Sequence, residues 1–383
     1  MTFHSIRSEF PITNEWIYLD NAGAVPLPRF VSESMKQFMD EYYHESITDH
    51  WSLLQDTVKE CRILFAKLIG SRPEEVALIG STSEGMNIVA NLVDFCPGDN
   101  VVVTDLEFPA NLFPWLNLTR KGVEVRTAKV SDAELPLEAI ARCVDDRTRV
   151  VAVAHVAFST GLRLDLAPIA DLAHAYGAFL AVDAVQSIGV VPLDVHAAEV
   201  DFLACSGFKW LMSPSGTGAF FCREELIHKY HPAYVSWFSV QNPYNFVPGG
   251  DFHLAEDASR FMISGNINLI GFQGFREALK FVLNTSVDAI FSHVQSLLVY
   301  IMERAEALEL SLITPSELSR LGSIINIRVP DPDRLVQLLR NEHIYAVQRV
   351  GGVRFSPYIY NTRRELEIVM GLVEDFVKLG KKA

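Results

Sequence analysis

The chain has 383 residues, of which 49% are hydrophobic and 21% charged, a composition typical of a globular protein with a large core. The formal net charge is −14 and no basic run is long enough to follow a phosphate backbone, so we expect no nucleic-acid partner. No apolar run is long enough to span a membrane and the N-terminus does not read as a secretory signal, so we expect a cytoplasmic protein without a membrane partner.

Cysteine and histidine usage narrows the chemistry. The five cysteines are scattered without a C-x-x-C pair, which indicates reduced thiols rather than a disulfide framework. The 11 histidines show no metal-ligand spacing, so we expect no metal.

The first two thirds of the chain alternate strand-like and helix-like segments. Continuous apolar runs of this kind, separated by helical stretches such as 166–177, predict βαβ units and a mostly parallel sheet with both faces covered, the α/β class. The strand-like runs cover residues 76–82, 100–108, 149–161, 177–189 and 201–210.

The pattern changes after about residue 262. A long helical pattern, a strand, a helix, a β-rich stretch and a final helix from Thr362 predict a smaller α+β domain. We therefore predict a large domain at 19–261 and a small domain formed by 1–18 and 262–383. The C-terminal segments of that domain cover residues 270–310, 323–329, 332–342 and 344–357.

Two charged residues follow neighbouring apolar strands. Asp183 ends one strand, and an isolated carboxylate there costs several kcal/mol unless a cation accompanies it. Lys209 comes at the end of the next strand, with Ser206 three residues before it. Such a set suits pyridoxal phosphate (PLP): the lysine forms the Schiff base, the aspartate keeps the ring nitrogen protonated, and the hydroxyl binds phosphate. The same residues fit a buried structural ion pair equally well.

Six ordered motifs along nearly the whole chain resemble those of the class V aminotransferase and cysteine desulfurase superfamily of fold-type I PLP enzymes. The resemblance implies a large domain with a mostly parallel sheet of the seven-stranded type, a smaller α+β C-terminal domain, and PLP as cofactor. The motifs are "YLDNAGAVPLP" (18–28), "STSEGMN" (81–87), "EFPANLFPW" (107–115), "VDAVQSIG" (182–189) with "SGFKW" (206–210), "GNINLIGFQG" (265–274) and "RFSPYIYNT" (354–362).

The resemblance implies that four side chains contact the cofactor around its ring. Lys209 would carry PLP and move the proton at Cα, and its apolar surroundings favour the neutral amine that both tasks need. Asp183 would pair with the pyridine nitrogen, Gln186 would hydrogen-bond the phenolic oxygen, and Phe108 would stack on the ring.

The resemblance also assigns the cofactor phosphate. Ser83, Ser206 and the backbone N–H of Thr82 would hold it at a helix start. Asn266 stands where the family has a threonine that binds the phosphate of the neighbouring subunit, which implies a homodimer with active sites shared across the interface.

The substrate side is assigned in the same way. Arg354 would grip the α-carboxylate of an amino acid in a bidentate pair, although a surface ion pair is the alternative. Asn21 and Ala22 would line the substrate side, and an ordinary turn fits them as well. His155 either orders the cofactor pocket or is a satisfied core histidine.

Several positions depart from the family pattern. Phe108 and Phe208 stand where desulfurases carry histidines, and Phe158 stands where many relatives carry asparagine. The stretch 341–357 lacks the cysteine that desulfurases carry on a mobile loop, and Cys205 reads as inert strand core. We therefore predict that the chain is not a persulfide-forming cysteine desulfurase.

The predicted reaction takes place at the Cα of a small-molecule amino acid. The leading expectation is a β-eliminating C–S lyase acting on a cysteine conjugate, with an amino-acid epimerase or a class V aminotransferase as alternatives. A non-catalytic PLP-fold binding protein is the alternative from another class. A dehydrogenase is disfavoured because "GTGAFF" (216–221) lacks the third glycine of a dinucleotide motif.

Overall fold

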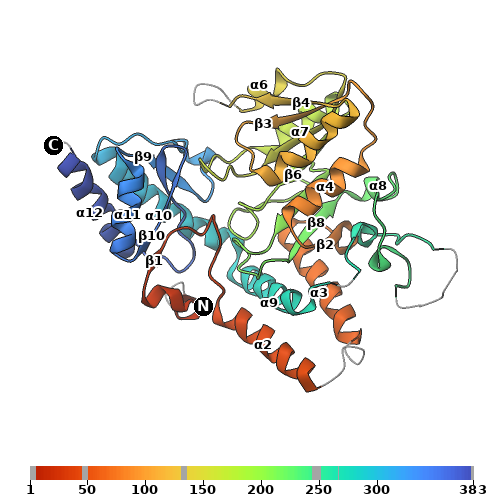
Figure 1. Ribbon diagram of the computed structural model, residues 1–383, viewed down its shortest axis with the longest axis horizontal. Coiled ribbons are helices and arrows are strands. Elements are labelled where there is room, and N and C mark those ends of the chain that lie inside the picture. The colour runs from red at the N-terminus through yellow and green to blue at the C-terminus, as the bar shows by residue number, and fades with distance from the viewer. Residues whose placement is uncertain (1–5, 45–50, 131–135, 244–251, 266, 381–383) are drawn as a thin grey trace.

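A computed structural model describes residues 6–44, 51–130, 136–243, 252–265 and 267–380 of the chain. Its centre is a seven-stranded sheet in the order β2-β8-β7-β6-β5-β3-β4 (Figure 1). Five adjacent strands, from β7 to β4, run parallel, and β8 pairs antiparallel with both of its neighbours. The strands are β2 (Val76–Ile79), β3 (Asn100–Thr104), β4 (Glu124–Ala128), β5 (Thr148–Ala154), β6 (Phe179–Asp183), β7 (Phe202–Ser206) and β8 (Gly218–Cys222). The predicted α/β class with a mostly parallel sheet is confirmed.

Helices cover this sheet on both faces, which explains why its central strands are buried along nearly their whole length. Helix α4 packs on β7 and β8, α7 packs on β5 and β6, and α2 and α3 pack together on α9. Among the described residues, no helix is both long and apolar enough to cross a membrane. The helices of this part are α2 (Arg29–His44), α3 (Trp51–Ile69), α4 (Thr82–Leu92), α5 (Phe113–Leu116), α6 (Pro136–Ala141), α7 (Leu166–Ala175) and α8 (Glu224–Ile227).

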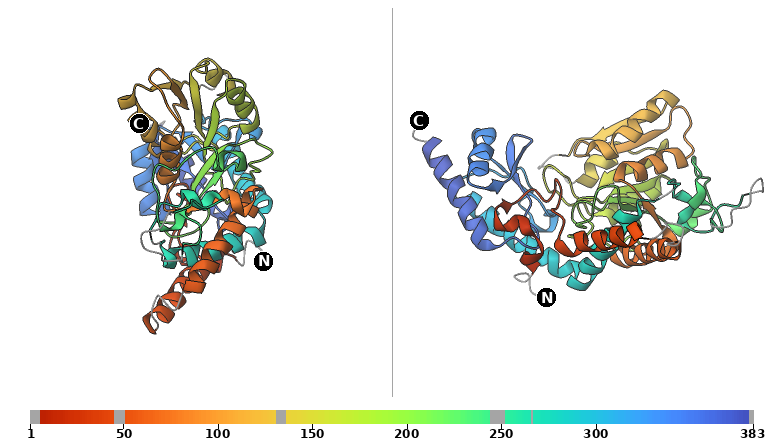
Figure 2. Two further views of the ribbon diagram at one scale, coloured as in Figure 1. Left: turned by 90° about the vertical axis from the view of Figure 1, so that its right-hand side faces the viewer. Right: turned by 60° about the horizontal axis from the view of Figure 1, so that its bottom comes forward.

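The C-terminal third forms a second, smaller body of helices and strands (Figure 2). Strands β11, β12 and β9 form an antiparallel sheet, and β1 (Ile17–Tyr18) near the N-terminus pairs with β10. The predicted domain boundaries themselves stay a prediction. Helix α9 (Leu269–Thr285) lies beside α2 and α3. The elements of the smaller body are α10 (Val287–Ala307), β9 (Ile325–Arg328), α11 (Pro332–Asn341), β10 (Ile344–Tyr345), β11 (Val347–Arg349), β12 (Gly352–Phe355) and α12 (Arg363–Gly380).

Three details differ from the sequence-based expectation. The single helical pattern at 270–310 is two helices, because Ser286 takes a positive φ of 73° between them. Strand β8 comes from the "GAFFC" run, which the parallel βαβ pattern did not include. Strand β4 lies at the sheet edge, and its exposed and half-buried residues give no apolar run.

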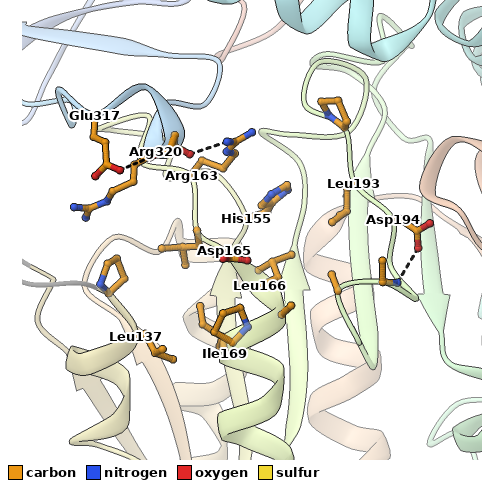
Figure 3. Close-up of a pocket in the computed structure, with 18 residues that line it drawn as sticks. Leu137, His155, Arg163, Asp165, Leu166, Ile169, Leu193, Asp194, Glu317 and Arg320 are labelled. Carbon is orange, nitrogen blue, oxygen red and sulfur yellow. Dashed lines mark hydrogen bonds between the residues drawn. The ribbon is translucent and has the colours of Figure 1, made fainter.

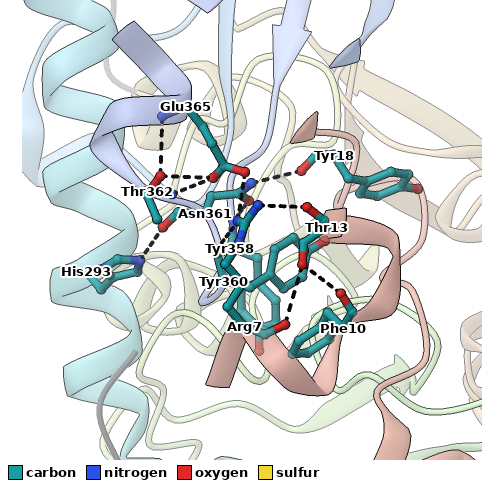
Figure 4. Close-up of polar contacts among 10 residues, drawn as sticks. All are labelled: Arg7, Phe10, Thr13, Tyr18, His293, Tyr358, Tyr360, Asn361, Thr362 and Glu365. Atoms are coloured by element: carbon teal, nitrogen blue, oxygen red, sulfur yellow. Dashed lines mark hydrogen bonds and ion pairs between the residues drawn. The ribbon is translucent and has the colours of Figure 1, made fainter. Parts of the chain in front are cut away.

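Polar contacts tie the N-terminal segment to the C-terminal one (Figure 4). The Arg7 guanidinium donates to the carbonyls of Tyr360 (2.9 Å) and Thr13 (2.9 Å) and pairs with Glu365 at 2.7 Å. The Asn361 amide donates to the Tyr18 carbonyl at 3.2 Å. These bonds fix the chain on either side of the segments that carry Asn21 and Arg354.

Gly161 offers a test of this packing. It has φ +75°, and a Cβ built on it would lie 2.1 Å from the Ile324 carbonyl oxygen. Gly161→Ala should therefore lower the free energy of unfolding by about 3 kcal/mol or more, through strain and overpacking together. Gly177→Ala is the matched control, since its φ is +72° with nothing within 4 Å, and it should cost only about 1 kcal/mol. Equal losses in urea titrations of the two variants would refute the packing argument.

Candidate active site

The parallel strands bring their carboxyl ends to one edge of the sheet. In the strand register Ala154 of β5 lies beside Asp183 of β6, and Asp183 lies beside Ala204 of β7. The turn after β7 then places Lys209 over this edge. Ala154, Asp183, Gln186, Lys209 and Phe108 all line one small cavity there. The site therefore lies where ligands bind in open α/β sheets.

Lys209 is 7% exposed. In the part of the chain that the structure describes, its Nζ has no hydrogen bond or ion pair, and its nearest cation–π contacts are the rings of Phe108 at 5.5 Å and Phe208 at 5.6 Å. Burial lowers the pKa of the amine from 10.5 to about 8, although Asp183 acts in the opposite direction. At pH 7 about a tenth of this buried amine is therefore neutral, far more than for an ordinary lysine, which suits a nucleophile or a base.

Asp183 is 2% exposed, and only one of its two carboxylate oxygens has a hydrogen-bond donor among the described residues. Its Oδ1 accepts a hydrogen bond from the Val185 N–H at 3.0 Å, and among the described residues no donor reaches Oδ2. Burial raises the pKa of this carboxyl to about 6, while the Val185 N–H and Lys209 oppose the shift. A buried carboxylate with one open oxygen calls for a donor, and a protonated pyridine nitrogen supplies one. The residues present fit PLP.

Hydroxyl groups gather where helix α4 begins. Ser206 Oγ accepts the Thr82 N–H at 2.7 Å and lies 3.0 Å from Thr82 Oγ1. The N–H of Thr82, which we predicted for the phosphate, is thus already bound to Ser206, whereas Ser83 is exposed. The helix start still favours an anion. Asn266 lies outside the described residues.

Two amide side chains anchor the N-terminal segment beside the site. Gln186 Nε2 donates to the Ala22 carbonyl at 2.9 Å, and its Oε1 accepts from Trp210 Nε1 at 2.9 Å. Asn21 is fully buried and bonded to the Tyr360 hydroxyl and to the Ser356 carbonyl. The structure brings Asn21 and Ala22 to the site region as part of a fixed turn, and the ligand contacts of Gln186, Asn21 and Ala22 stay predictions.

Arg354 lies on β12 and is 2% exposed. Its Nη2 donates to Asp20 at 2.5 Å and its Nη1 to the Phe158 carbonyl at 2.7 Å, while Nε has no partner in the described chain. The surface ion pair that we considered is absent here, since the pair with Asp20 is buried. Sequence reasoning missed Asp20, although an acidic residue directly after β1 and before Asn21 was a usable signal.

Aromatic rings form the open side of the site. Phe108 is 43% exposed and meets Phe158 edge to face at 5.2 Å between ring centroids. Beside it Glu107 is buried, and burial raises the pKa of its carboxyl to about 7 despite bonds from Thr104 and Asn111. The rings exclude water from Lys209 without supplying an acid or base.

Known proteins resemble the chain over nearly its full length. It is 28% identical over 409 residues to the "Probable cysteine desulfurase" of Methanothermobacter thermautotrophicus, with 99% of each chain covered. It is 30% identical over 342 residues to the "Cysteine desulfurase" of Salmonella newport, covering 85% of this chain and 82% of the other. The solved apo cysteine desulfurase from Thermococcus onnurineus superposes with a TM-score of 0.87 at 28% identity, covering 98% of both chains.

These similarities overturn the functional prediction. We predicted a β-eliminating C–S lyase acting on a cysteine conjugate and excluded a persulfide-forming cysteine desulfurase. This prediction is wrong, because the similar proteins are described as cysteine desulfurases. The prediction relied on Phe108, Phe158, Phe208 and the cysteine-free stretch around the β11–β12 hairpin. Those are local changes in a chain whose similarity to desulfurases is continuous.

The family is also matched directly. The model described as "Aminotransferase class-V" matches residues 17–369, which include every predicted site residue. This range contains both the seven-stranded sheet and the smaller C-terminal body, and the solved relative shares both. The chain belongs to the class V aminotransferase family and is a PLP-dependent enzyme of fold type I.

Proposed function

We propose that the chain is a PLP-dependent cysteine desulfurase, which takes sulfur from L-cysteine and releases L-alanine. The observation that carries the proposal is the continuous similarity to cysteine desulfurases, which reaches 30% identity over 85% of this chain. The reaction breaks the Cβ–S bond of cysteine and forms an S–S bond to an acceptor thiol, whose proton ends on Cβ. Cysteine and a thiol thus give alanine and a persulfide, and the atoms balance without an external oxidant or reductant.

Lys209 acts at the Cα of the substrate, and Asp183 acts at the ring nitrogen of the cofactor. Bound PLP supplies an electron sink for the Cα of the amino acid joined to it. The Lys209 amine would be the attachment point of the cofactor and the base that takes the proton from Cα, and its burial keeps part of it neutral for both roles. The Asp183 carboxylate keeps a proton on the ring nitrogen, which keeps the sink effective.

Other groups orient the substrate and the cofactor. Arg354 holds the substrate carboxylate, and its buried Nε has no partner in the residues that the structure describes. Ser83 and Ser206 hold the phosphate at the start of α4, and Phe108 covers the ring on the open side. We also propose a cytoplasmic homodimer whose sites are shared across the interface.

Product analysis tests the proposal. The PLP-loaded protein is incubated with L-cysteine and dithiothreitol, and alanine, sulfide and pyruvate are quantified. Alanine and sulfide in equal amounts, with no pyruvate, are the expected result. Formation of pyruvate in place of alanine would overturn the assignment. Transamination, in which the amino group passes to the cofactor and no sulfide is released, would overturn it as well.

Cofactor capture by the apo protein should depend on pH. Only the neutral Lys209 amine attacks the aldehyde, and burial lowers its pKa from 10.5 to about 8. The neutral fraction therefore rises as pH passes through about 8, whereas an ordinary lysine would gain it only near 10.5. Stopped-flow absorbance from pH 6 to 10 should show a PLP-binding rate that climbs about tenfold per unit below pH 8 and flattens above it. A rate that still climbs between pH 9 and 10 would contradict the lowered pKa.

A further inference from the structure

A second cavity of about 720 Å³ lies away from the cofactor site (Figure 3). One wall comes from the segment after β5 and the start of α7, and another from the 3-10 helix Leu318–Arg320 and the residue before it. Most of the lining is apolar, including Leu137, Leu166 and Ile169. Its volume and lining are those of a small-molecule site, and the proposed reaction assigns it no role.

His155 is a buried polar side chain that faces this cavity. It is 4% exposed, it lines the cavity, and its Nδ1 has no hydrogen-bond partner in the described chain. The preceding residue, Ala154, lines the cofactor cavity, so the two neighbours line different cavities. The unpartnered Nδ1 contradicts the interpretation as a satisfied core histidine. The His155 N–H donates to the Asp183 carbonyl at 2.9 Å, and an ordering role for the cofactor pocket stays a prediction. Burial, aided by Arg163, lowers the pKa of His155 to about 3, so the ring is neutral and provides one donor and one acceptor.

The start of helix α7 opens into the same cavity. Leu166 and Ala167 are the first two residues of this ten-residue helix and line the cavity. Their N–H groups have no acceptor within the helix, and the side chain of Asp165 at the N-cap accepts no capping bond. Two free N–H groups and the positive end of the helix dipole thus face the space in front of His155.

Two arginines add positive charge at the rim. Arg163 donates from Nη2 to the Ser319 carbonyl at 2.7 Å, and Arg320 has no ion pair or side-chain hydrogen bond within the described residues. Three acidic residues also line the cavity. The charge of Asp165 acts on the neighbouring Arg163, and the other two carboxylates are engaged in hydrogen bonds. Asp194 accepts the N–H groups of His196 and Ala197, and Glu317 accepts the Ser319 hydroxyl. The unengaged donors therefore favour an anion.

We propose that this cavity, defined by His155, the start of α7 and Arg320, binds a small carboxylic acid with an apolar, aromatic-sized body. The carboxylate lies between Arg320 and the N–H groups of Leu166 and Ala167, and His155 donates or accepts a further hydrogen bond. The apolar body packs on Leu137 and Ile169. This site is separate from Arg354, to which we assign the amino-acid carboxylate and which does not line the cavity.

Calorimetric titration of the PLP-loaded enzyme tests the site, with phenylacetate as the probe and phenylacetamide as its uncharged match. We expect phenylacetate to bind one equivalent per chain and phenylacetamide to bind at least about tenfold more weakly. Arg320→Ala should weaken phenylacetate about tenfold, and Ala167→Trp, which fills the cavity, should abolish binding. Arg328→Ala is the control, because Arg328 is an exposed arginine of β9 that does not line the cavity.

Equal binding of phenylacetate by the parent and Arg320→Ala would overturn the proposal, as would equal affinity for the acid and the amide. The PLP absorbance and melting temperature of Arg320→Ala should match the parent, which separates loss of the site from misfolding. If Ala167→Trp does not fold, the comparison of Arg320→Ala with Arg328→Ala and of phenylacetate with phenylacetamide still tests the proposed site. Desulfurase activity is not part of this readout, so its absence would leave the test intact.

Discussion

Replacement of Lys209 by alanine should abolish the turnover of L-cysteine, with a fall in rate of about 10⁴-fold or more. The variant loses both the amine that attaches the cofactor and the base at Cα, and a positioned base alone contributes about 10²–10⁴-fold. The visible absorbance of the lysine-bound cofactor should disappear as well. Steady-state alanine formation and the absorbance spectrum of the reconstituted protein measure these effects. Lys121→Ala, at an exposed lysine, should change neither.

Stability provides an independent check on Lys209. Its folded pKa is lowered to about 8 from 10.5, so between these values the unfolded chain binds more protons than the folded one. The apo protein should therefore gain stability from this group as pH rises from 8 to 10.5, and it should lack that gain below pH 8. Lys209→Ala should remove this part of the pH dependence and be no less stable at pH 7. A less stable variant at pH 7 would show that the lysine has a structural partner.

Replacement of Arg354 by alanine should have the second largest effect. Loss of the carboxylate grip should raise KM for L-cysteine about 100-fold or more. The same change leaves Asp20 buried without its cation, which should cost about 3–5 kcal/mol of folding stability. Kinetics and urea titration measure the two effects separately.

A double variant distinguishes these two roles of Arg354. Asp20→Asn removes the stranded charge, so Asp20→Asn with Arg354→Ala should recover much of the lost stability but none of the lost affinity. Arg349→Ala, at an exposed arginine on the neighbouring strand β11, should leave KM unchanged. An unaltered KM in Arg354→Ala would refute the assignment of the substrate carboxylate.

The sequence was sufficient for the parts of the fold that local patterns encode. The apolar runs predicted five strands of the central sheet, and the polar residues at their ends led to Asp183 and Lys209. Strand β4 was not predicted because it lies at the edge of the sheet, where most of its residues are exposed or half-buried and form no apolar run. Strand β8 was not predicted because its place between β2 and β7, antiparallel to both, depends on how distant segments pair and not on a local pattern.

Other features depend on contacts between distant segments. The pair of Arg354 with Asp20 joins residues 334 apart, and nothing local predicts it. The cavity that the His155 side chain faces depends on where the pairing of β5 with β6 ends, which is at Ala154. The functional error had another cause: three phenylalanines and a missing cysteine were given more weight than the similarity of the whole chain.

The site of cofactor attachment is the most direct test of the account. The PLP-loaded protein is reduced with borohydride, digested, and mapped by mass spectrometry. The account predicts that the cofactor mass lies on the peptide that contains Lys209, in close to one equivalent per chain. Attachment to any other lysine, or no stable attachment at all, would contradict it.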